Sequence, residues 1–248
     1  MHWYNPGMDE TLTSVIRERY QRVLDQISEA IARCGREAGT VRLVVVSKTQ
    51  PLDVVRAAIA AGVAILGENY AEEAVAKIAA LTGTAVEWHM IGHVQSRKAD
   101  LVAEHFSMLH SLDSVKLAGR LDRLCEEFGR TLPVLLEVNV SGEQSKFGFP
   151  AWDETHWLNL KPVLEQIIAF SHLSVRGLMT MPPIFDNPEK SRPYFQRLHR
   201  LQILLRELFP QIEWTELSMG TSSDFIIAIE EGATYLRVGQ AILGPRKG

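Results

Sequence analysis

Cysteine, long apolar runs and excess charge are all scarce in this chain. Only Cys34 and Cys125 carry thiols among its 248 residues. Each is isolated within an apolar helical pattern, so we expect buried thiols of a reducing compartment and no disulfide framework. No run approaches the ~18 apolar residues of a membrane span, and residues 1–6 lack the basic region and apolar core of a signal peptide. These absences predict a soluble, cytoplasmic protein.

The charge balance limits the partners of the chain. A formal charge of −4 and a pI of about 6.1 argue against electrostatic binding of nucleic acid. His89 and His93 are four positions apart in the chain, a spacing that tempts a metal assignment, but the His-Glu-x-x-His pattern on a helix is absent. We therefore expect structural histidines, no metal and no nucleic acid.

Short apolar runs alternate with helical patterns along most of the chain. We expect a strand at each of these runs: 41–46, 63–67, 86–92, 108–112, 133–140, 173–179, 214–218 and 235–238. The helical segment at 154–170 contains Pro162, which would break a continuous helix. Eight strands in 248 residues predict an α/β fold, a single (β/α)8 TIM barrel at 41–248. An N-terminal extension and helix at 1–40 is expected to pack on it.

Lys48 lies where the first strand gives way to a loop, before Pro51 and Asp53 start a helix. Barrels of this kind carry their chemistry on the loops that follow the strands. Burial can lower the pKa of a lysine by up to ~3–5 units, and such a lysine can form a Schiff base with an aldehyde. An ordinary surface lysine past the end of a strand is the alternative.

The loops after the last two strands have the composition of an anion site. The segment from Ser218 to Asp224 is rich in glycine and hydroxyl side chains, and Gly239 follows the eighth strand. Barrels often bind phosphate between these two loops. Ser222 or Ser223 could instead merely cap a helix and Gly239 make a turn. The coincidence of both loops at one position favours phosphate.

Three other polar residues keep two interpretations each. Arg237, within the eighth strand, could face a ring nitrogen of a ligand or pair with a structural carboxylate. Asn69 could lie beside a ligand ring or form a local turn, and Lys146 could approach the site or lie in a surface loop. An aldehyde-binding lysine and a phosphate site at one barrel mouth suggest pyridoxal 5′-phosphate (PLP) as the cofactor.

Several segments of the chain resemble one known family, the pyridoxal phosphate homeostasis proteins. The most specific of them is Trp88 to Lys98, and together they cover roughly residues 41–245. The matching segments are 46–49, 67–70, 88–98, 145–148, 177–179, 217–220 and 237–239.

The resemblance implies a fold-type III barrel like the N-terminal domain of alanine racemase, with Lys48 holding PLP as a Schiff base. It implies that Arg237 faces the pyridine nitrogen and that Asn69 and Met90 line the ring pocket. It also implies a set of residues around the phosphate: Ser218, Gly220, Thr221, Ser222 and Gly239. The family commonly has Met where this chain has Thr221, and Asn where it has Arg97.

The function that the resemblance implies is intracellular PLP (vitamin B6) homeostasis and amino-acid balance, without established catalytic residues. The implied partners are PLP and PLP-dependent apoenzymes. No residues follow Gly248 to form the β-domain that supplies a second base in alanine racemase, so we expect a monomer without classical turnover. The alternatives are a PLP-dependent racemase or decarboxylase of fold-type III, with Tyr70 as the substitute phenol, and a cofactor-free Schiff-base aldolase.

Overall fold

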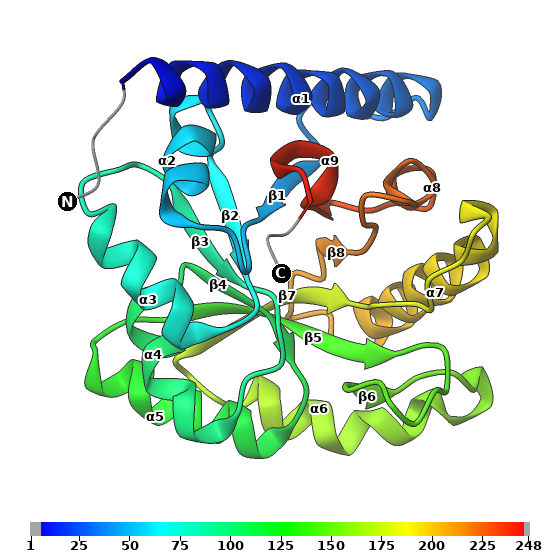
Figure 1. Cartoon of the computed structure of the whole chain (residues 1–248). Coiled ribbons are helices and arrows are strands. Elements are labelled where there is room, and N and C mark those ends of the chain that lie inside the picture. The colour runs from blue at the N-terminus through cyan, green and yellow to red at the C-terminus, as the bar shows by residue number, and fades with distance from the viewer. Residues whose placement is uncertain (1–5, 246–248) are drawn as a thin grey trace.

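The computed structural model describes residues 6–245 and confirms the predicted TIM barrel (Figure 1). Eight parallel strands form a closed ring in which β9 pairs with β1. The ring strands are β1 (Arg42–Val46), β2 (Ile65–Glu68), β3 (Glu87–Met90), β4 (Met108–Leu112), β5 (Leu132–Asn139), β7 (Leu173–Met179), β8 (Glu216–Ser218) and β9 (Tyr235–Val238). A short extra strand, β6 (Phe149–Pro150), pairs with the end of β5.

Helices surround the ring, and α1 lies across one side of it (Figure 1). α1 contacts α2, α8 and α9. The α-helices are α1 (Pro6–Arg33), α2 (Leu52–Ala60), α3 (Ala71–Ala80), α4 (Ala99–His105), α5 (Val115–Glu127), α6 (Lys161–Ile168), α7 (Arg192–Leu208), α8 (Phe225–Glu230) and α9 (Gln240–Leu243). None of the helices within residues 6–245 is long and apolar enough to cross a membrane.

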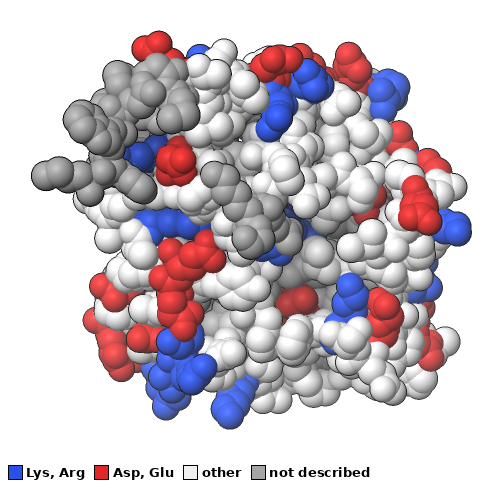
Figure 2. All heavy atoms as spheres, viewed as in Figure 1, with Lys and Arg blue, Asp and Glu red and all other residues white. Residues whose placement is uncertain are grey.

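Two apolar layers hold the barrel together. Side chains alternate between the two faces of each strand, so one set fills the barrel interior and the other meets the helices. The interior set is small: Val44, Ile65, Met108, Leu135, Met179 and Tyr235. The outer set is much larger and includes the fully buried Trp214, Phe106 and Phe195. Charged side chains of both signs are interspersed on the face shown in Figure 2.

The structure differs from the sequence prediction at a few local points. The expectation that both thiols are buried is right for Cys125 and wrong for Cys34, which is exposed because it follows Arg33 beyond the last turn of α1. The segment 154–170 is divided as Pro162 predicted: a 3-10 helix, Glu154–Leu160, precedes α6, and Pro162 occupies the first turn of α6. β6 and α9 were not predicted, because two and four residues carry no readable periodicity.

Gly92 allows two loops at the barrel mouth to approach closely. A Cβ at this position would lie 2.5 Å from the backbone oxygen and 2.6 Å from the Cα of Asn69. We expect Gly92→Ala to lower the free energy of unfolding by about 1–3 kcal/mol, because backbone atoms must move apart. Urea denaturation would measure the loss. Gly119→Ala in α5 is the control, since its Cβ meets only the ring of Phe170, at 3.1 Å; equal effects of the two changes would contradict the prediction.

Candidate functional site

A cavity of about 1090 Å³ opens at the carboxyl ends of the strands. It is lined by segments that follow β1, β2, β3, β5, β7, β8 and β9. Most of the residues singled out from the sequence line it: Lys48, Asn69, Met90, Thr221, Ser222, Arg237 and Gly239. Ser218 and Gly220 are not among the lining residues. The loops of the barrel mouth therefore converge on one space.

Lys48 lies in a tight turn directly after β1, partly exposed to the cavity. The next residue, Thr49, has a φ of 59°, and it is the only residue other than glycine with a positive φ among those described. A left-handed conformation is unfavourable for a β-branched residue, so the surroundings must hold the turn. The Thr49 N–H donates to Glu73 Oε1 at 2.8 Å, which ties the turn to α3.

A buried group of charged side chains supports the same turn from the side of α3. Lys77 Nζ donates to the Ser47 carbonyl and to Glu68 Oε1, each at 2.8 Å, and to Glu73 Oε1 at 2.7 Å. Ser47 Oγ also donates to Glu68 Oε1, at 2.7 Å. Burial raises the pKa of Glu68, although its hydrogen bonds from Lys77 and Ser47 oppose the shift. This group fixes the backbone on both sides of Lys48.

Arg237 points from β9 into the barrel and is 4% exposed. Its Nη1 donates to Ser218 Oγ at 2.5 Å, and its Nη2 donates to the Thr180 carbonyl and to Met181 Sδ, both at 2.8 Å. Burial lowers the pKa of Arg237 to about 10, so the guanidinium stays charged at neutral pH. These three acceptors are neutral, so the direct carboxylate pairing considered from the sequence is not among them, although Asp224 and Glu137 act on Arg237 through their charge.

The loops after β8 and β9 meet, as the phosphate hypothesis requires. The Gly239 N–H donates to Ser222 Oγ at 3.4 Å. Thr221 donates from both its N–H and its hydroxyl to Asp224 Oδ1, at 2.7 and 3.0 Å. The structure separates Ser218 from this set, because its hydroxyl is used by Arg237 and by His110 Nδ1. Gly220 has a φ of 90° and packs against α8 rather than the cavity.

Basic and aromatic side chains surround the outer part of the cavity. Arg97, Lys98 and Lys146 line it, together with Tyr70, which is 56% exposed. Lys146 therefore approaches the site, the first of its two interpretations. Phe147 stacks on His93 with ring centroids 3.9 Å apart, which joins the loop after β5 to the loop after β3. His89, which lies four positions before His93 in the sequence, is inside the barrel, so these two histidines do not share one site.

Glu137 is the cavity residue that the sequence analysis missed. It lies on β5 in the run Leu132–Asn139, where a single carboxylate interrupts an apolar strand; that interruption was the available signal. Burial raises its pKa to about 7, and the nearby Asp113 adds to the shift, while Arg237 and Lys146 oppose it. The cavity thus holds a carboxyl group that gains or loses its proton near neutral pH.

Comparisons with known proteins agree with this fold. Residues 23–247 match the family model described as alanine racemase, N-terminal domain. A pyridoxal phosphate homeostasis protein of Aquifex aeolicus is 38% identical over 230 residues, 93% of this chain and 98% of the relative. A protein of the same description from Pseudomonas aeruginosa is 40% identical over 233 residues, 94% and 96% of the two chains.

A solved relative has nearly the same structure. PipY of Synechococcus elongatus is 36% identical in its structure without PLP, with a TM-score of 0.82, covering 92% of this chain and 100% of PipY. Its structure with PLP bound has a TM-score of 0.80 at 35% identity. The fold and the mouth define a barrel of the alanine racemase N-terminal class. Within that class, the chain belongs to the family of pyridoxal phosphate homeostasis proteins.

The raised pKa of Glu137 has a measurable consequence for stability. Between about pH 4.5 and about 7 the folded protein holds a proton that the unfolded chain has released, so the stability contributed by this proton is lost as pH rises through that window. We expect Glu137→Gln to remove this slope, which can reach about 1.4 kcal/mol per pH unit. Urea denaturation of both proteins across the window tests it; parallel stability curves would show that Glu137 titrates normally.

Proposed function

We propose that this protein binds PLP in the cavity at the carboxyl ends of the strands, with Lys48 Nζ as the covalent attachment point, and that it serves PLP homeostasis. The observation that carries the proposal is the juxtaposition of Lys48 with a hydroxyl-lined loop pair and a buried arginine in one cavity. PipY, which is similar over nearly its whole length, has been solved with PLP bound.

The residues present fit the cofactor in three separate respects. The amine of Lys48 matches its aldehyde. The Ser222 hydroxyl accepts from the Gly239 N–H and can itself donate to an anionic phosphate, as loops at this position of a barrel commonly do. Thr221 lies beside it in the cavity lining, with its own N–H and hydroxyl donated to Asp224. Asn69 and Met90 also line the cavity, where they would contact the ring.

Arg237 defines what the bound cofactor can do. PLP supplies an electron sink when its ring nitrogen carries a proton. A guanidinium that stays charged at neutral pH disfavours a second positive charge beside it. Our proposal therefore assigns to this chain the holding and release of PLP rather than catalytic turnover.

The same proposal covers partners and location. PLP-dependent apoenzymes are the proposed acceptors, which the exposed rim formed by Tyr70, Phe147 and Ile184 would meet. A monomer is the proposed acting form. The two free cysteines suit the reducing cytoplasm as the proposed site of action.

Covalent binding at Lys48 can be tested directly. Purified protein mixed with PLP should acquire a visible absorption band that borohydride removes, and peptide mass analysis should place the reduced adduct on Lys48. Lys48→Ala should lose both the band and the adduct. Lys146→Ala is the matched control, because Lys146 lines the same cavity and should leave the adduct on Lys48. An adduct on another lysine, or protein that stays colourless, would overturn the assignment.

The phosphate position yields a second test. Ser222→Ala should weaken the binding of PLP about tenfold or more, because a hydrogen bond to a charged group contributes about 1.5–3 kcal/mol. Binding of inorganic phosphate, measured by competition with PLP, should weaken by the same factor. Ser171→Ala is the control, since Ser171 is exposed and its Oγ lies 3.3 Å from His172 Nδ1, in an exposed contact. Unchanged affinity in Ser222→Ala would place the phosphate elsewhere.

A further inference from the structure

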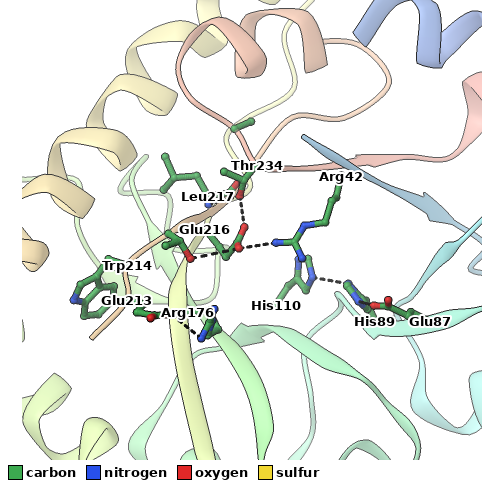
Figure 3. A network of polar contacts seen from close by, with 12 residues as sticks. Arg42, Glu87, His89, His110, Arg176, Glu213, Trp214, Glu216, Leu217 and Thr234 are labelled. Atoms are coloured by element: carbon green, nitrogen blue, oxygen red, sulfur yellow. Dashed lines mark hydrogen bonds and ion pairs between the residues drawn. The ribbon is translucent and has the colours of Figure 1, made fainter. Parts of the chain in front are cut away.

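A chain of polar side chains runs through the interior of the barrel and ends at Arg237. His89 Nε2 lies 3.3 Å from Glu87 Oε2, and His89 Nδ1 lies 3.0 Å from His110 Nε2. His110 Nδ1 lies 2.8 Å from Ser218 Oγ, which receives the Arg237 Nη1 donor. Figure 3 shows the two imidazoles joined inside the ring of strands. His89 and His110 are 1% and 0% exposed.

For neutral imidazoles, the direction of every hydrogen bond between Arg237 and Glu87 follows from these two end groups. A guanidinium can only donate, so Ser218 Oγ accepts from Arg237 and turns its own hydrogen toward His110 Nδ1. A neutral His110 then carries its hydrogen on Nε2 and donates it to His89 Nδ1. His89 in turn donates from Nε2 to the Glu87 carboxylate, which can only accept. When both imidazoles are neutral, every contact pairs a donor with an acceptor only if both are Nε2–H tautomers.

The surroundings favour these neutral imidazoles. Burial lowers the pKa of His89 to about 4, although Glu87 opposes the shift, and burial lowers the pKa of His110 well below its usual value. The positive charges of Arg42 and Arg237 act in the same direction. The ring of Tyr235 meets both imidazoles edge-on, with centroids 5.7 and 5.0 Å away.

Arg42 fixes that tyrosine from the opposite mouth of the barrel. Its guanidinium carbon lies 3.9 Å from the centre of the Tyr235 ring. Arg42 also forms an ion pair with Glu216 at 2.5 Å, and Glu216 accepts from the Thr234 hydroxyl at 2.6 Å (Figure 3). The imidazole pair is therefore held by ring contacts as well as by its hydrogen bonds.

We propose that His110, acting through Ser218, is a positioning residue for Arg237, and that the one-way chain from Arg237 to Glu87 fixes how the guanidinium presents itself to the cofactor ring. The cofactor part of this inference rests on the proposed function. The hydrogen-bond part does not rest on it, because every hydrogen bond from Arg237 to Glu87 is present in the protein without cofactor.

The hydrogen positions can be tested in wild-type protein without cofactor. Nitrogen-15 NMR of the histidine side chains should show His89 and His110 as Nε2–H tautomers that do not titrate between about pH 6 and about pH 8, where an exposed histidine does. Ser218→Ala should abolish the tautomer preference of His110. A wild-type His110 that carries its hydrogen on Nδ1, or is charged near neutral pH, would overturn the inference whether or not PLP binds.

Two replacements of His110 then distinguish the contact made by its Nδ1 from the contact made by its Nε2. Asparagine can keep an acceptor where Nδ1 faces Ser218, whereas glutamine places its amide where Nε2 faces His89. In protein loaded with PLP, we expect His110→Gln to weaken PLP binding about tenfold and His110→Asn by no more than about twofold. Affinity for inorganic phosphate should be unchanged in both, because the contact lies at Arg237 and not at the Ser222 loop.

A general structural defect would not give this pattern. His156→Asn, at a side chain that is 69% exposed, controls for the loss of a histidine and should bind PLP like the wild type. Equal losses in His110→Asn and His110→Gln, no loss in either, or a parallel loss of phosphate affinity would each overturn the positioning role. Failure of the wild type to bind PLP would instead overturn the proposed function, and the tautomers alone would then decide the inference.

Discussion

The pairing of β1 with β9 is the contact on which the site depends. Its register places Val44 beside Arg237 and Val45 beside Val238, so the strand that leads to Lys48 neighbours the strand that leads to Gly239. These strands lie at opposite ends of the chain, and joining them costs conformational entropy that the apolar layers must offset. Without closure, the lysine and the loop at Gly239 would not share one mouth.

Closure of the barrel brings the Lys48 turn to the mouth, but a separate group of buried hydrogen bonds holds the conformation of the turn. Thr49 adopts a conformation that costs free energy for a β-branched residue. The backbone around it is held by Lys77 and Glu73, and these in turn depend on the buried Glu68. One Glu68 oxygen has no hydrogen-bond partner within the described residues. Such a buried ion pair contributes little net stability, and its evident effect here is to define the turn.

Periodicity was enough to predict the barrel, because parallel strands covered on both faces give apolar runs of recognisable length. The position of Lys48 followed, since a strand end in a barrel fixes a place at the mouth. Contacts between distant side chains could not be read in the same way. Ser218 and Ser222 look equivalent in sequence, yet one faces Arg237 and the other faces Gly239. The burial of Glu137 and the exposure of Cys34 likewise depend on packing that strand and helix patterns do not encode.

The polar interior of this barrel explains why its arginine can serve a ligand. Polar groups are costly to bury unless each finds a partner, and the chain from Ser218 to Glu87 satisfies that condition with neutral groups beside the guanidinium. A carboxylate hydrogen-bonded to Arg237 would cancel its charge; instead, the guanidinium donates to a hydroxyl, a carbonyl and a thioether. Burial raises the pKa of the nearby Glu137 carboxyl to about 7, and the Asp224 carboxylate also acts on Arg237 through its charge. The guanidinium of Arg237 therefore lines the cavity with no carboxylate among these three hydrogen-bond acceptors.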